Sequence, residues 1–135
     1  MAKPPPTPVY HHEDAERLAE HWMRWAGFRD ARKTPRGPDR GIDVRASGAV
    51  AQVKLHERPI GRPALQQLHG AAVSEGKPSL FFSYAGYSDQ ALEFGNSVGM
   101  ALFRFDLSGV VRPVNRRAAT IARAADGLGP PVSSQ

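Results

Sequence analysis

Residues 39–55, which read DRGIDVRASGAVAQVKL, decide the fold of this chain. Residues 42–46 and 49–55 alternate apolar with polar side chains, and Ser47-Gly48 lies between the two runs. Two alternating runs joined by a short turn that contains glycine are typical of a β-hairpin. Because a two-residue turn fixes the register of the two strands, the pattern predicts that Asp43 lies opposite Gln52.

The two faces of this hairpin differ in chemistry. One face is apolar and is expected to hold Ile42, Val44, Ala46, Ala49, Ala51, Val53 and Leu55. The other face holds Asp43, Arg45, Gln52 and Lys54, with Val50 as its apolar member. Opposed residues have Cβ atoms about 5 Å apart, so Asp43 and Gln52 can hold one ion between them, with Lys54 close by. The alternative is a hairpin that turns these charges to solvent.

The segment before the hairpin predicts an amphipathic helix that ends at Gly27. Its apolar residues recur at helical spacing and are Ala15, Leu18, Ala19, Trp22, Met23 and Ala26. Glu16 lies on the flank of this stripe, where it either leans into a cleft or stays solvated, whereas Glu13 and Glu20 are expected to lie farther toward water. The pair His11-His12 is not expected to bind a metal, because adjacent residues lie on different faces of a helix.

The rest of the chain alternates strands with helices. The expected elements are a strand after Phe28, a loop over 34–40, a helix from Pro63, a buried strand over 79–84, a helix capped by Ser88, a strand over 100–105 and a weaker one over 110–114. The order αβββαβαβ predicts an α/β domain over residues 10–114, with a mixed β-sheet flanked by helices. A short basic helix is expected over 115–125. Residues 1–9 are expected to form a disordered Pro-rich arm, and residues 126–135 a disordered tail.

Composition limits the class of protein. The chain has 135 residues, which fits one domain, and a net charge of +5, which favours a polyanionic partner. It has no cysteine, which excludes disulfides, thiolate metal sites and a cysteine nucleophile. No apolar run reaches the roughly 18 residues of a membrane span, and the N-terminus does not read as a secretory signal. We therefore expect an intracellular protein with no membrane partner, and the family resemblance given next implies a cytoplasmic, prokaryotic or phage-type, nucleoid-associated one.

Together these residues resemble the Mrr-type restriction endonuclease family, a branch of the PD-(D/E)xK nuclease superfamily. The matching segments are Ala15-Glu16, Gly27-Phe28, residues 39–44 (DRGIDV), Gln52-Val53-Lys54, residues 61–68 (GRPALQQL) and Gly70-Ala71. The resemblance covers nearly everything between Glu13 and Asp106. It implies a restriction-endonuclease-like core and magnesium-dependent hydrolysis of DNA phosphodiester bonds, with manganese as a substitute for magnesium.

The resemblance also implies roles for single residues. Asp43 corresponds to the metal-binding aspartate of the family, Gln52 to its second acidic position, which this branch often fills with glutamine, and Lys54 to its catalytic lysine. Glu16 corresponds to the acid carried by the first helix, and Asp39 to a supporting loop residue. Magnesium prefers hard oxygen ligands, which Asp43 and the Gln52 amide supply. Because Gln52 is neutral, metal affinity depends on Glu16 providing the missing charge.

Basic and amide side chains near this cleft are candidates for contacts with DNA phosphates. They are Arg36, Arg40, Arg45, Arg58, Arg62 and Gln66. The alternative for each is an ordinary surface residue, and for Arg45 a partner carboxylate. The leading hypothesis is a metal-dependent DNA endonuclease of restriction, defence or DNA repair. Two alternatives stay open, a structure-selective nuclease similar to Holliday junction resolvases and an inactive DNA-binding or assembly module. A homodimer or a recruiting protein is a further expected partner.

Overall fold

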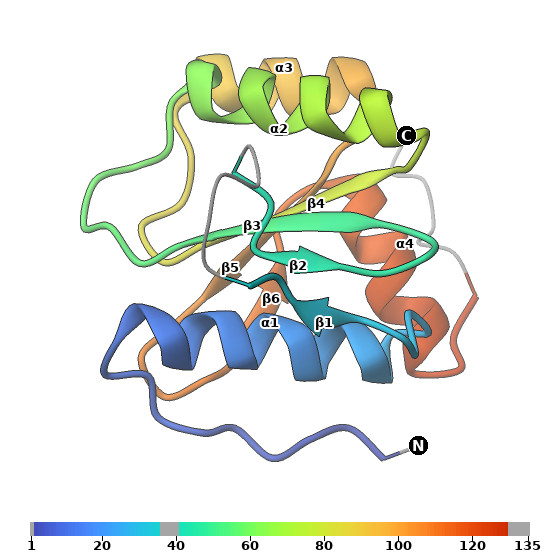
Figure 1. Ribbon diagram of the computed structural model, residues 1–135. Helices are drawn as coiled ribbons and strands as arrows, with labels where there is room; N and C mark the ends of the chain where they lie inside the picture. The colour runs from blue at the N-terminus through green and yellow to red at the C-terminus, as the bar shows by residue number, and fades with distance from the viewer. Residues whose placement is uncertain (1, 36–40, 130–135) are drawn as a thin grey trace.

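A computed structural model describes residues 2–35 and 41–129 of the chain. A six-stranded mixed sheet runs through the middle of the molecule in the order β1-β2-β3-β4-β5-β6 (Figure 1). The strands are β1 (Arg32–Lys33), β2 (Val44–Arg45), β3 (Val50–Lys54), β4 (Ser79–Ser83), β5 (Ala101–Phe105) and β6 (Val111–Pro113). The three longest strands, β3, β4 and β5, run parallel to one another, and the remaining neighbours are antiparallel.

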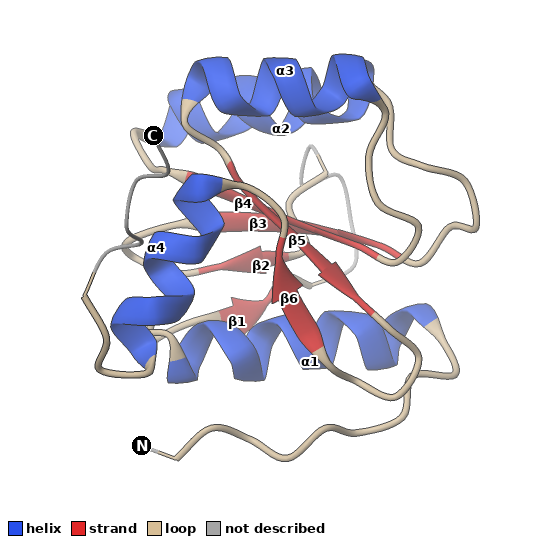
Figure 2. Cartoon of the chain, turned by 180° about the vertical axis from the view of Figure 1, so that it is seen from behind, coloured by secondary structure: helices blue, strands red, loops and turns tan. Residues whose placement is uncertain are grey.

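Four helices cover the two faces of this sheet. They are α1 (His12–Trp25), α2 (Arg62–Glu75), α3 (Asp89–Val98) and α4 (Arg116–Ala125). Helices α2 and α3 pack on one face, while α1 and α4 pack on the other (Figures 1 and 2). The element order confirms the expected α/β domain with a mixed sheet flanked by helices. None of the helices in the described residues is long and apolar enough to cross a lipid bilayer.

The central strands are apolar on both faces because helices cover both. Along β4, Leu80 and Phe82 pack beneath α1 and α4, while Phe81 packs beneath α2 and α3. The ring of Phe82 stacks on Phe103 of β5 at 4.9 Å between centroids, and the Trp22 ring of α1 lies 4.6 Å from that of Phe103. This aromatic cluster fixes α1 against the middle of the sheet, and with it every other side chain that α1 carries.

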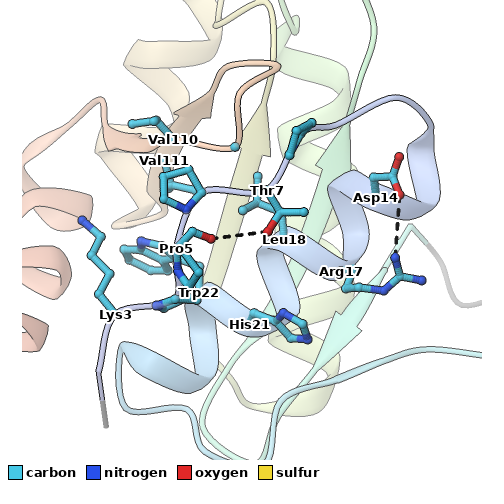
Figure 3. A pocket seen from close by; sticks show the side chains of 14 residues that line it. Lys3, Pro5, Thr7, Asp14, Arg17, Leu18, His21, Trp22, Val110 and Val111 are labelled. Atoms are coloured by element: carbon cyan, nitrogen blue, oxygen red, sulfur yellow. Dashed lines mark hydrogen bonds and ion pairs between the residues drawn. The ribbon is translucent and has the colours of Figure 1, made fainter.

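The Pro-rich segment at the start of the chain runs back along α1 (Figure 3). Residues 2–8 have no regular secondary structure and most are exposed. Val9, however, is only 3 % exposed, and its N–H donates to the Leu107 carbonyl at 2.9 Å. The expectation that residues 1–9 stay outside the fold is therefore wrong at Val9, whose apolar side chain gains from burial beside the aromatic cluster. Residues 130–135 of the expected tail lie outside the described residues.

Candidate active site

Close to its turn the hairpin of β2 and β3 has the predicted register, but the pairing stops before Asp43, so the expectation that Asp43 lies opposite Gln52 is wrong. Val44 lies opposite Ala51, and Arg45 lies opposite Val50. The Ala46 N–H donates to the Ala49 carbonyl at 2.9 Å and closes the turn. Because the side chains of a strand alternate between faces, this register also decides what β3 presents at its far end, where Gln52 and Lys54 lie.

The alternation ends at Asp43. Its N–H donates to the carbonyl of Ala51 at 2.8 Å, although Ala51 is already the register partner of Val44. Two consecutive residues therefore oppose one, which is the pattern of a β-bulge. As a result Ile42 packs beneath α2 and α3, whereas Val44 packs beneath α1. The expectation that Ile42 shares a face with Val44 is wrong, because the bulge turns the chain between them.

This bulge directs the Asp43 carboxylate to the gap between β3 and α1. Asp43 Oδ2 accepts a hydrogen bond of 2.8 Å from the Val53 N–H of β3. A carboxylate oxygen of Asp43, a carboxylate oxygen of Glu16 and a ring nitrogen of His12 all lie within 4.8 Å of one another. The ammonium of Lys54 also acts on the Asp43 carboxylate electrostatically. The structure thus brings together three of the four residues expected from the sequence, Asp43, Glu16 and Lys54, and adds His12.

Helix α1 supplies one wall of the resulting cleft. His12 Nε2 lies 3.3 Å from Glu16 Oε2, and Lys33 Nζ of β1 lies 3.8 Å from Glu16 Oε1. The first turn of α1 is fixed because Asp14 Oδ2 accepts the N–H groups of Tyr10 and His11, each at 2.9 Å. The cleft has a volume of about 790 Å³, and its lining includes His12, Glu16, Lys33, Gly41 and Asp43.

Gln52 lies next to Gly41, one of the residues that line this cleft. Gln52 is 3 % exposed, and within residues 2–35 and 41–129 its Oε1 has no hydrogen-bond partner. A Cβ on Gly41, whose φ is +82°, would come within 3.2 Å of the Gln52 amide, so glycine leaves the space that this amide occupies. Leaving a buried carbonyl oxygen without a partner is costly, and such an oxygen is also a hard ligand for a cation. Gln52 therefore fits a ligand role.

Electrostatics in the cleft favour a cation. Burial raises the pKa of Asp43 above its ordinary value, the hydrogen bond from Val53 opposes this shift, and the nearby Glu16 carboxylate raises the pKa further. A cation beside both carboxylates removes their repulsion and compensates the lost solvation of Asp43. The donor set of two carboxylates, one imidazole and one unpartnered amide oxygen therefore fits a divalent metal ion.

A comparison with known protein families identifies the family of this chain. A sequence model of a restriction endonuclease family, Mrr_cat, matches residues 10–106, which run from the start of α1 past the end of β5. The chain belongs to this restriction endonuclease family. Its six-stranded mixed sheet and four flanking helices fit the restriction-endonuclease-like fold, and the family is one of nucleases whose substrate is DNA. No curated protein and no solved structure matches the chain.

The residues expected to contact DNA lie in different settings. Arg45 donates to both carboxylate oxygens of Glu75, at 3.0 Å and 2.8 Å, which is the carboxylate partner weighed as its alternative. Arg58 and Gln66 are exposed, while Arg62 is half-buried with its Nε unpartnered among the described residues. Arg36, Asp39 and Arg40 lie outside the described residues.

Two residues, His12 and Glu20, lie in settings that differ from those expected from the sequence. Adjacent residues such as His11 and His12 do not share a helix face, which argues against a metal site made by the pair. His12, however, lies four residues before Glu16, a spacing that puts both side chains on one face of a helix. That spacing is the signal that could have found it. Glu20 does not lie toward water. Its Oε2 accepts the Lys33 N–H at 2.7 Å and ties β1 to α1.

Proposed function

We propose that this member of the family is a metal-dependent endodeoxyribonuclease that hydrolyses DNA phosphodiester bonds in restriction, defence or DNA processing. The observation that carries the proposal is the position of the Asp43 carboxylate. It is held by the Val53 N–H of β3 at 2.8 Å and lies beside Glu16 of α1, within the field of Lys54. A half-buried acid beside a second acid and within the field of a lysine is an arrangement that suits phosphoryl hydrolysis.

The metal would be held by Asp43, Glu16 and the Gln52 amide oxygen, with magnesium or manganese as the ion. When bound, the metal lowers the pKa of a water molecule and neutralises charge that develops on the phosphate. The protein contributes position and charge. Asp43 is fixed by a backbone N–H, and Glu16 is fixed by His12 and Lys33.

Lys54 would act on the reacting phosphate. Among the described residues it has no ion-pair partner within 4.0 Å, and its side chain is half-buried at the end of β3. An ammonium in this position either orients the attacking water or stabilises the charge on the phosphate oxygens. The flanking phosphates would be held by Arg58, Arg62 and Gln66, together with Arg36 and Arg40. Lys33, which lines the cleft, would add a further positive charge there.

The test is cleavage of supercoiled plasmid with magnesium or manganese. Lys54→Ala and Asp43→Ala should each lower the nicking rate by about 100-fold or more, because each removes a charge from the reacting centre. Arg117→Ala is the matched control, since Arg117 is an exposed cation of α4 outside the family match, and it should cleave like the wild type. Nicking that persists at the wild-type rate in both cleft variants contradicts the proposal.

The neutral Gln52 supports a second candidate, a DNA-binding module of the same fold without catalytic activity. Such a module binds DNA in a salt-sensitive way without metal and cleaves nothing with any metal. A panel of linear duplex, four-way junction and single-stranded DNA separates this candidate from the nuclease. Preferential cutting of the junction would identify a resolvase-like, structure-selective enzyme.

A further inference from the structure

We propose that His12 is a direct ligand of the metal, and that it gives this site a preference for transition ions such as Mn²⁺ over Mg²⁺. This inference rests on the proposed function, because it concerns the same cleft. It goes beyond it by adding a nitrogen ligand from α1 to a set that otherwise consists of oxygens.

The geometry suits a shared ion. The ring nitrogen of His12 and the carboxylate oxygens of Glu16 and Asp43 lie within 4.8 Å of one another, and His12 Nε2 is 3.3 Å from Glu16 Oε2. Ligand atoms at about 2.0–2.2 Å from one ion are separated by at most roughly 4.4 Å. Small side-chain rotations therefore bring all three groups onto a single cation.

Rigid elements hold these donors. His12 and Glu16 are separated by one turn of α1, and Asp14 fixes the start of that helix by accepting the N–H groups of Tyr10 and His11. Asp43 approaches from the opposite wall and is fixed by Val53. The ligands therefore come from two elements that meet across the cleft, which limits the choice of ions to those that accept this mixed set.

A second observation points to a ligand at the same place. Gln52 is 3 % exposed, its Oε1 has no partner, and its amide lies against the backbone of Gly41, which lines the cleft beside Asp43. A cation near the cleft would satisfy this buried oxygen, which lies next to a residue that lines the same cleft as one imidazole and two carboxylates.

The chemistry of the donors selects the ion. Mg²⁺ strongly prefers oxygen and keeps several waters, whereas imidazole suits ions of the first transition row, and Mn²⁺ accepts carboxylates as well. A metal-bound imidazole is neutral and an amide carries no charge, so with two carboxylates as the remaining ligands the set would balance a divalent cation. Replacing the imidazole with an oxygen donor should therefore shift the site toward Mg²⁺.

The experiment measures metal binding and needs no cleavage. Titration calorimetry on the metal-free full chain, at about pH 8 so that imidazole is neutral, gives the affinities for Mn²⁺ and Mg²⁺ separately. Loss of a supporting partner alone costs about 10–100-fold in metal affinity, so His12→Gln should weaken Mn²⁺ binding at least tenfold. The glutamine oxygen can replace the imidazole toward Mg²⁺, so Mg²⁺ affinity should fall much less than Mn²⁺ affinity and the Mn²⁺/Mg²⁺ ratio should drop.

The matched control is His21→Gln. His21 is exposed on the same helix and lines the pocket on the side of α1 away from the cleft, so this variant should keep the wild-type ratio. Pulsed electron paramagnetic resonance of bound Mn²⁺ gives an independent signature. Nitrogen coupling from an imidazole should be present in the wild type and in His21→Gln, and absent in His12→Gln.

Three outcomes overturn the inference. They are no measurable Mn²⁺ binding by the wild type, no nitrogen coupling, or an equal loss of both metals in His12→Gln, which would mean that His12 only positions Glu16. The two proposals fail separately. Nitrogen-coupled Mn²⁺ without any DNA cleavage upholds this inference and contradicts the nuclease. Cleavage that depends on Lys54 in the absence of nitrogen coupling supports the nuclease and contradicts this inference.

Discussion

Helix α1 separates two hollows of opposite chemistry. On one side lies the metal cleft of about 790 Å³, lined by charged and polar groups such as His12, Glu16 and Asp43. On the other side lies a pocket of about 560 Å³ beneath the Pro-rich arm, where prolines meet Leu18, Trp22 and the turn between β5 and β6 (Figure 3). The same helix thus presents His12 and Glu16 to the metal cleft, and Leu18 and Trp22, flanked by Asp14, Arg17 and His21, to the arm.

The two sides of α1 contribute differently: the side under the arm stabilises the fold, and the side at the cleft holds the candidate metal ligands. Trp22 packs on the aromatic rings of β4 and β5, so the arm side belongs to the hydrophobic core. The cleft side instead buries a carboxylate with a raised pKa beside a second carboxylate, an arrangement that costs stability. Substitutions on the two sides should therefore separate folding from metal binding.

The largest expected effect is on the arm side. Trp22→Ala removes a side chain that is 4 % exposed and should lower the free energy of unfolding by about 3–5 kcal/mol, as measured by urea denaturation. Trp25→Ala is the control, and because Trp25 is only half-buried its loss should be smaller. Mn²⁺ affinity of the folded fraction should not change in either variant. A Trp22→Ala protein that is folded yet binds Mn²⁺ far more weakly would break the separation.

The next effect tests the cleft side. At a metal concentration of about 100 times Kd, the wild type should gain about 2.7 kcal/mol of stability, and Asp43→Asn should gain none. Without metal, Asp43→Asn should be at least as stable as the wild type. Folding raises the pKa of this acid, so its charged form opposes folding, and the amide removes that charge while keeping an oxygen for the Val53 N–H.

Asp106→Asn is the control for this measurement of thermal unfolding with and without metal. The Ser108 hydroxyl and the Val110 N–H lower the pKa of Asp106, so its charged form favours folding. The amide should therefore lower the stability at neutral pH but leave the effect of the metal intact. Equal behaviour of the two variants would show that the cleft acid has no special role.

The smallest effect concerns the contact between the arm and the turn before β6. Gly109 has φ +92°, and a Cβ there would clash with the backbone of Thr7. Gly27 has φ +109° with nothing within 4 Å of such a Cβ. Left-handed strain alone costs about 1–2 kcal/mol, so Gly27→Ala should lose that amount and Gly109→Ala more. Urea denaturation measures both, and equal losses would mean that the arm contact contributes nothing.

Local signals in the sequence predicted most of the fold. The turn at Ser47-Gly48 fixed the hairpin register, and the Ser88 side chain caps α3 by accepting the Ala91 N–H at 3.1 Å. Both depend on neighbours a few residues apart. The bulge at Asp43 could not be predicted, because it depends on Ile42 finding space beneath α2 and α3, which only tertiary packing decides.

The candidate site was predictable to a similar extent. The spacing of Gln52 and Lys54 on one strand was visible, and so was the position of Glu16 on the flank of α1. His12 could have been found by its spacing to Glu16, but its meaning depends on Asp43 lying across the cleft, which is a contact between distant segments. Val9 was missed because its neighbours are prolines, and composition alone does not show that a single apolar residue is buried.

The lengths of the paired strands give the edge and the middle of the sheet different rigidity. β3, which carries Gln52 and Lys54, pairs over five residues with β4, whereas β2, next to Asp43, and β1 are two residues long. Short pairings at a sheet edge open by local fluctuation, while central strands exchange their amide hydrogens only when the whole domain unfolds. The short strands β1 and β2 should therefore exchange their amide hydrogens faster than β3, while Asp43 stays joined to β3 through the Val53 N–H and keeps its place beside the lysine strand.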